Sequence, residues 1–364
     1  MRGHRRWLII VGVLVLVVVG FVFLRGPTPD IRIKPETLYS VGMVNITNTL
    51  VTSWVVVALM ITLVFLASRR WELVPRGVQN VLEFIIESFY NLVVGIVGEK
   101  NGRRFFPVVA TMFFFIVFAN WFSLFPIFNV IGLGEEAEEG VVMQKVDIGP
   151  LPVTYVGLSS LSQMKGRTID AEDPEAAQKV EEEKEKGNVV GEIRPFLRGI
   201  NTDLNMPLGL AIMSAIFVEF WGISTLGLST YGSKFFNFGG LLQGMRKLSV
   251  GQIFRGGVDA FVGFLELASE TVRLVSFTFR LFGNMFAGEV VILMFTFLIP
   301  LVFTLPFYGL ELFVGLIQAF IFALLTLVFG MMAVSHGSHP DAEEVEAETH
   351  HTQTTEDRPV NPEQ

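Results

Sequence analysis

Six charged residues lie well inside two long apolar stretches in the C-terminal half of the chain. They are Glu266, Glu270, Arg273, Arg280, Glu289 and Glu311. A charge near the centre of a bilayer costs at least about 3 kcal/mol on insertion scales, so such residues must face protein or water. They are therefore candidates for moving ions or protons through a membrane.

Helical spacing groups several polar residues around Arg280. At about 100° per residue, Glu266, Arg273 and Arg280 are spaced by seven and share one helical face to within about 40°. Glu270 precedes Arg273 by three residues, which is close enough for the two to pair. Asn284 lies one turn after Arg280 on the same side. This face of the helix therefore carries acidic, basic and amide side chains.

Arg280 itself has no acidic neighbour between Val275 and Gly288. A guanidinium stays protonated in proteins, so Arg280 is cationic at any depth in the membrane. Two interpretations remain open. Arg280 forms a structural ion pair with Glu311 or with an acid of another helix, or it is a fixed cation that meets a carboxylate from another subunit.

Glu289 and Glu311 are candidates for proton-exchanging carboxyl groups. Glu289 follows Arg280 by nine residues and points to the opposite helical face, whereas Glu311 and Gln318 share a face of the last helix. None of the five histidines lies in an apolar stretch, so a proton path would use carboxylates, polar side chains and water. The histidines near the C-terminus fit a polar tail better than a metal site, and no metal or cofactor is expected.

Composition predicts an all-α polytopic membrane protein. Hydrophobic residues make up 51% of the 364 residues and charged residues only 17%, against about 25% in soluble domains. We expect about six transmembrane helices, within residues 7–24, 48–67, 105–133, 204–227, 258–299 and 307–334. The fifth is far longer than a bilayer is thick, so it is tilted or projects from the membrane.

Basic residues predict the orientation of the chain. Residues 1–24 form a membrane anchor or a signal sequence, and the arginines before Trp7 place the N-terminus in the cytoplasm. No A-x-A cleavage site follows before Arg25, which favours a retained anchor over a cleaved signal peptide. Residues 25–47 then form an external linker. Six spans would place the C-terminus in the cytoplasm too.

The region over residues 48–133 holds the second and third spans and an amphipathic helix between them. Residues 75–98 have apolar positions at helical spacing, interrupted every four residues by the stripe Gln79, Glu83 and Glu87. This pattern predicts a helix on the membrane surface or against other helices.

Two further segments are strongly polar. Residues 134–202 are rich in Glu and Lys and form a charged external insertion, with a helical piece over residues 174–186. Residues 336–364 form an acidic tail, expected to be disordered and cytoplasmic, with eight acids and one base. The tail carries seven of the eight net negative charges, and the nearly neutral remainder gives nucleic-acid binding no electrostatic support.

Four segments resemble subunit a, the membrane stator and proton-channel subunit of F-type ATP synthase. RLFGNMFAGE (residues 280–289) is similar to the family signature, and IQAFIF (317–322) follows it at the matching spacing. VPRGVQNVLEFIIE (74–87) and TDLNMPLGLA (202–211) support the resemblance, which covers residues 45–133 and 196–337.

The resemblance implies that the last two helices, in a channel core over residues 203–335, lie tilted against a rotating ring of c subunits. It implies two aqueous half-channels with an essential arginine between them. It assigns proton translocation to Arg280, Glu289, Glu311, Gln318 and Asn284. It also suggests a cytoplasmic half-channel lined by Glu266, Glu270 and Arg273.

The implied partners are c-ring subunits, peripheral-stalk b subunits, the lipid bilayer of a bacterial inner membrane and, indirectly, the F1 sector. No G-x-x-x-x-G-K-[ST] motif occurs, so direct nucleotide binding and catalysis by this chain alone are not expected. The alternative function is a stand-alone proton-coupled secondary transporter, although no internal repeat supports it. A purely structural scaffold would leave Arg280 without a role.

Glu219 interrupts the fourth span, and the sequence favours a place at the cytoplasmic surface over one in the exit channel.

Overall fold

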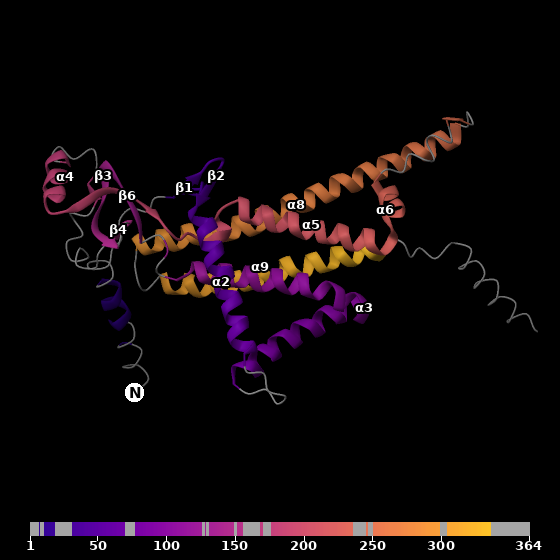
Figure 1. The fold of residues 1–364 in the computed structure, drawn as a ribbon, viewed down its shortest axis with the longest axis horizontal. Helices are drawn as coiled ribbons and strands as arrows, with labels where there is room; N and C mark the ends of the chain where they lie inside the picture. The colour runs from indigo at the N-terminus through magenta and orange to yellow at the C-terminus, as the bar shows by residue number, and fades with distance from the viewer. Residues whose placement is uncertain are drawn as a thin grey trace, which may run out of the picture. The chain divides into compact units, whose positions relative to one another are not determined.

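The computed structural model describes residues 7, 11–18, 31–69, 77–125, 128, 131–148, 151–155, 168–169, 176–235, 245–246, 250–298 and 304–335. The chain forms two compact units. One contains residues 1–214 and 271–326, and the other contains residues 215–270 and 327–364. Figure 1 shows the order of the helices and strands along the chain.

Five helices among the described residues are long and apolar enough to cross a membrane. They are α2 (Asn48–Ser68), α3 (Val78–Ser123), α5 (Asn205–Leu226), α8 (Val250–Leu298) and α9 (Thr304–Ser335). They correspond to the last five predicted spans, so the all-α polytopic class is confirmed. Of the predicted anchor only Trp7 and residues 11–18 are described, and these are helical; the rest of the anchor and the tail over 336–364 lie outside the described residues.

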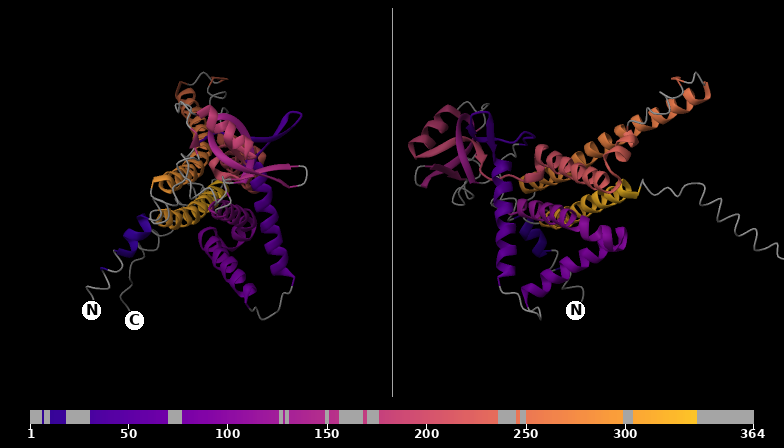
Figure 2. Two further views of the ribbon diagram at one scale, coloured as in Figure 1. Left: turned by 90° about the vertical axis from the view of Figure 1, so that its left-hand side faces the viewer. Right: turned by 45° about the vertical axis from the view of Figure 1, so that its right-hand side comes forward.

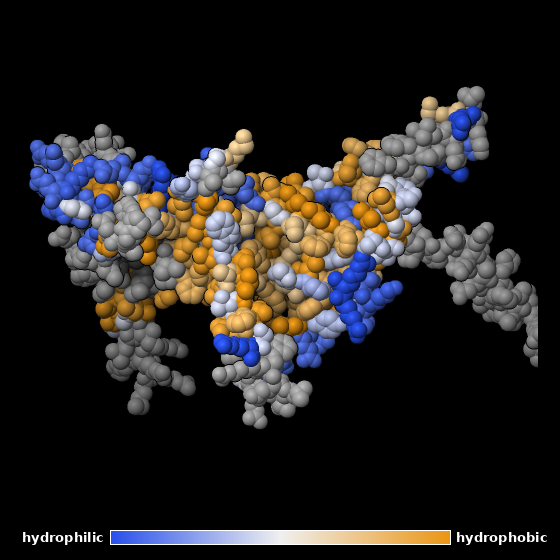
Figure 3. Space-filling view, viewed as in Figure 1, coloured by the Kyte–Doolittle hydropathy of each residue, from blue (hydrophilic) through white to orange (hydrophobic). Residues whose placement is uncertain are grey.

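The surface of α2 shows why lipid must cover these helices. Ile61, Val64 and Phe65 are 65%, 67% and 60% exposed. Figure 3 shows apolar residues over this part of the first unit and hydrophilic residues over α4 and the strands beside it. Water would leave this much apolar area unfavourably exposed, whereas a bilayer covers it.

A β-hairpin leads from the predicted linker into α2. Strands β1 (Thr37–Val41) and β2 (Val44–Thr47) pair antiparallel, and Gly42 in their turn has a φ of 62°. The Thr47 hydroxyl then accepts a hydrogen bond from the Leu50 N–H at 3.3 Å, which caps the first turn of α2.

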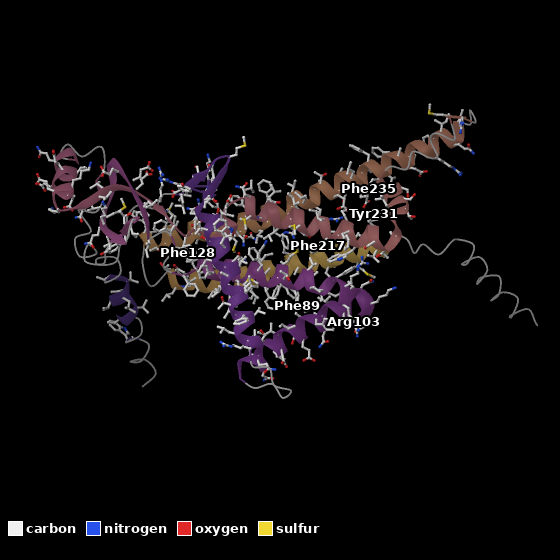
Figure 4. All side chains as sticks on the ribbon, viewed as in Figure 1. Phe89, Arg103, Phe128, Phe217, Tyr231 and Phe235 are labelled. Carbon is white, nitrogen blue, oxygen red and sulfur yellow. The ribbon has the colours of Figure 1, made fainter. Side chains whose placement is uncertain are left out.

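Helix α3 is two helical limbs joined at Gly98, whose φ of 77° and ψ of 164° suit a residue without a side chain. The first limb begins at Val78 and lies within the helix predicted over residues 75–98. Gln79 Nε2 donates to Glu83 Oε1 at 2.6 Å along the predicted stripe. The two limbs fold back on each other in Figures 1 and 2. Phe89 of the first limb, labelled in Figure 4, stacks on Phe113 of the second with ring centroids 4.6 Å apart.

The third span is shorter than predicted. Helix α3 ends at Ser123, and residues 131–133 of the predicted span already belong to strand β3. Pro126 in the sequence explains the early end, because a proline disfavours helical geometry at the residue before it.

The region predicted as an insertion contains a small antiparallel sheet. Strand β3 (Ile131–Ile148) pairs with β4 (Leu151–Tyr155), β5 (Thr168–Ile169) and β6 (Asn188–Pro195). Helix α4 (Ala176–Glu185) confirms the predicted helical piece, and Val142, Val180 and Val190 form a shared core. The sequence analysis did not predict the sheet, because the acidic run in β3 hides the alternation expected of a strand.

Each of the last two long helices has part of its length in the first unit. Helix α8 has 49 residues, about 74 Å at 1.5 Å per residue, against about 30 Å of bilayer hydrocarbon. Residues 271–298 of α8 pack on α9 through two ring pairs, Phe277 with Phe322 and Phe295 with Phe307, at 4.9 and 4.2 Å. Pro306 lies in the first turn of α9, where a proline is tolerated; Pro300 lies outside the described residues.

The second unit contains the C-terminal part of α5 and the short helix α6 (Leu228–Phe235). Gly227 separates the two helices with a φ of 84°, and a Cβ at Gly222 would collide with the Tyr231 ring. Tyr231 packs on Phe235 with centroids 5.8 Å apart (Figure 4). Glu219 is half-buried in α5 and has no ion pair within the described residues.

Candidate functional site

Arg280 lies on α8, and no carboxylate among the described residues pairs with it. Its Nη2 donates to Ser276 Oγ, one turn earlier, at 3.3 Å. Its Cζ lies 5.8 Å from the centre of the Phe277 ring, within the range of a cation–π contact. No acid among the described residues forms an ion pair with it, including Glu311, which was one of the two partners considered from the sequence. The cation is thus available to a group outside this part of the chain.

A side-chain hydrogen bond joins α8 to α9 one turn beyond Arg280. Asn284 Nδ2 donates to Gln318 Oε1 at 2.6 Å. Gln318 is 3% exposed, and its Nε2 is buried without an acceptor among the described residues. The structure therefore brings together two residues that the sequence placed on separate helices.

Glu311 is buried against the backbone of α8. Its carboxyl group occupies the space that a Cβ at Gly288 would need. Glu311 is 9% exposed, and no described residue donates a hydrogen bond or offers a cation to it. The missing side chain at Gly288 thus creates the room in which this carboxyl group lies.

Glu289 faces a different partner from Arg280. Its Oε2 lies 3.9 Å from Nη2 of Arg198, and the two side chains are 17% and 7% exposed. Arg198 comes from the segment between β6 and the 3-10 helix η2 (Ile200–Thr202). This geometry agrees with the predicted direction of Glu289, away from the face of Arg280. The sequence analysis missed Arg198 because it lies outside every predicted span.

The three residues expected at a cytoplasmic half-channel lie on the N-terminal side of Arg280 in α8. They are Glu266, Glu270 and Arg273. Glu266 and Glu270 belong to the second unit and Arg273 to the first. Each is half-buried.

Hydrogen bonds from α3 to the α9 backbone hold the part of α9 that carries Glu311 and Gln318 in place against α3. Asn120 Nδ2 in α3 donates to the Gly315 carbonyl at 3.2 Å, and Trp121 Nε1 donates to the Leu312 carbonyl at 3.0 Å. Asn201 Nδ2 of η2 in turn donates to Asn120 Oδ1 at 2.6 Å. The sequence analysis named none of these three donors, although buried polar residues in apolar helices are a signal for such contacts.

The site is built from groups that can attract a charge or exchange a proton. It combines a fixed cation, two acids with restricted solvent access and two amides. Among the described residues, no cluster of three or more His, Asp or Glu side chains could hold a metal ion.

Comparisons with known proteins identify the family of the chain. The family model described as ATP synthase A chain matches residues 50–330. The chain belongs to this family. It is 27% identical over 300 residues to an ATP synthase subunit a from Moorella thermoacetica, covering 82% of this chain and 95% of that protein. It is 26% identical over 293 residues to one from Gloeobacter violaceus, covering 80% and 86%.

Family membership fixes the general role of the chain. It is a multi-pass membrane subunit of the proton-translocating sector of an F-type ATP synthase, and it is not catalytic itself. The matched range contains every residue of the site described above, from Asn120 to Gln318.

Proposed function

We propose that Arg280 is the fixed cation between two aqueous half-channels through which this subunit passes protons to a rotating c-ring. The observation that carries the proposal is a guanidinium on a membrane helix with no carboxylate partner in the described part of the chain. A permanent charge at this depth is costly, so it needs a counter-ion. An ionised c-subunit carboxylate that arrives and leaves as the ring turns would supply one.

The external half-channel would run past Glu289 and Glu311. Both acids lie at the same level of α8, because Glu311 packs against Gly288, the neighbour of Glu289. Carboxyl groups with restricted access to solvent can take up a proton and release it again without leaving the site.

Asn284 and Gln318 would separate this half-channel from Arg280. Their 2.6 Å hydrogen bond crosses from α8 to α9 between the two levels. The buried Nε2 of Gln318 donates to no described residue, so its N–H groups could donate to a c-subunit carboxylate or to a water.

The cytoplasmic half-channel would involve Glu266, Glu270 and Arg273 on the other side of Arg280 along α8. We further propose the partner subunits, the membrane and the orientation that the sequence predicts. The partners are the c-ring, the peripheral-stalk b subunits and, indirectly, the F1 sector. The membrane is a bacterial inner membrane, with both chain termini in the cytoplasm.

The test compares proton movement in inverted membrane vesicles that contain the complete complex. Arg280→Ala should assemble but lose ATP-driven proton uptake, because nothing then attracts the c-ring carboxylate. Arg255→Ala is the matched control, since Arg255 is an exposed arginine of the same helix. It should pump at the wild-type rate.

Two outcomes would contradict the proposal. Normal pumping by an assembled Arg280→Ala complex would remove Arg280 from the proton path. Substrate-coupled proton uptake by the purified chain alone in liposomes would instead favour the stand-alone transporter.

A further inference from the structure

Arg198 is held in one place by three hydrogen bonds, one to α2 and two to the linker, all within the first unit. Its backbone N–H donates to Thr52 Oγ1 of α2 at 3.1 Å. Its Nη1 donates to the Lys34 carbonyl at 3.0 Å, and its Nη2 donates to the Arg32 carbonyl. A guanidinium with donors fixed in this way has little freedom to follow a moving partner.

The linker that receives these bonds is itself fastened. Arg32 forms an ion pair with Glu36 at 2.7 Å, and it also pairs with Glu192 of the inserted sheet. The Glu36 carbonyl accepts the Asn48 N–H at 3.1 Å at the start of α2. The linker and the insertion thus meet around Arg198.

Glu289 is the acid that Arg198 faces. The Arg198 side chain is 7% exposed, and among the described residues Glu289 is its ion-pair partner, at 3.9 Å. A buried guanidinium interacts with a nearby carboxylate far more strongly than an exposed one, because less water screens the two charges. Arg198 is therefore placed to decide where the Glu289 carboxyl group lies.

We propose that Arg198 is a positioning residue of the external half-channel: fixed by the linker carbonyls, it orients Glu289 for proton transfer. This inference rests on the assignment of Glu289 to that half-channel. It gives a role to the segment before α5 and to the linker, neither of which lies in a membrane span. It also explains why the linker and the sheet converge there.

A double-mutant cycle on the complete complex tests this proposal. ATP-driven proton uptake is measured for Arg198→Met, for Glu289→Gln and for the double variant, with rates normalised to the assembled complex. We expect each single variant to lose at least about threefold in rate. The double variant should pump at the rate of Glu289→Gln within about twofold, which is the usual scatter in such cycles. Arg198 would then act through Glu289.

Three results would overturn the proposal. One is wild-type pumping by Arg198→Met. Another is a double variant whose loss is the product of the two single losses, because Arg198 would then act independently of Glu289. The third is wild-type pumping by Glu289→Gln, which would also contradict the proposed function. In the first two cases the proposed function stands.

Two further variants guard against a trivial loss of structure. Arg194→Met is the matched control, since Arg194 lies four residues earlier and pairs with Glu135 of β3, with Nε 2.7 Å from Oε2. It should pump normally. Should Arg198→Met fail to assemble, Arg198→Lys keeps the charge but loses the forked donors, and the same cycle with Glu289→Gln decides the outcome.

Discussion

Adding one methyl group at Gly288 should displace the Glu311 carboxyl group. Gly288 lies in α8, and a Cβ built there falls on the carboxyl atoms of Glu311 from α9. The colliding atoms are the far end of a flexible side chain rather than backbone. Gly288→Ala should therefore move this carboxyl group and leave the two helices in place.

The gain and the cost of this substitution nearly cancel in the free energy of unfolding, whereas the rate of proton pumping should still fall. Replacing a helical glycine by alanine contributes about 0.5–1 kcal/mol in favour of the helix. Forcing Glu311 out of its rotamer costs about 0.5–1.5 kcal/mol. Misplacing a reacting group by 1 Å, in contrast, can lower a rate by about 100-fold. We thus expect near-normal assembly and proton pumping that falls by roughly tenfold to 100-fold.

The assay is ATP-driven proton uptake in inverted vesicles, with the assembled complex quantified by native electrophoresis. Gly257→Ala is the matched control, because Gly257 lies in the same helix with open space around its Cβ position. Wild-type pumping by an assembled Gly288→Ala complex would refute the view that the position of Glu311 matters. An equal loss in Gly257→Ala would show a general effect on α8.

Three further predictions concern hydrogen bonds and pH. Asn284→Leu should lower the thermal stability of the purified complex by about 1–3 kcal/mol, because it leaves Gln318 Oε1 buried without its donor. Adding Gln318→Leu to this variant should lower the stability by less than the first substitution did. Thr326→Val removes the partner of the Ser214 hydroxyl, 2.8 Å away, and should also lower the thermal stability of the complex by about 1–3 kcal/mol. An unchanged midpoint of thermal dissociation would contradict this. Burial raises the pKa of Glu36 above its ordinary value of 4.5, more than Arg32 lowers it. Folding therefore favours the neutral carboxyl, and stability from this group is lost as pH rises above 4.5. Relative to wild type, Glu36→Gln should therefore gain protease resistance in the linker as the pH rises above 4.5, and a relative loss would show the opposite sign.

Local sequence patterns were sufficient to predict most of the helices. Apolar stretches and helical spacing, such as that of Arg280 and Asn284, involve only residues close together in the chain. They therefore predict where a helix lies and which residues share its face, with no knowledge of what the helix packs against. The same reasoning placed Glu289 on the face away from Arg280, in agreement with its contact to Arg198. It failed for the inserted sheet, since the pairing of β3 with β6 depends on residues far apart in the chain.

The sequence by itself determined the membrane class, the helices and the presence of charges within them, because hydropathy and periodicity are properties of short segments. Tertiary structure alone decided which groups meet. It set Glu311 against Gly288, joined Asn284 to Gln318 and turned Glu289 toward Arg198. Each of these contacts joins residues from different segments, and their geometry depends on how whole helices pack, which no local pattern encodes.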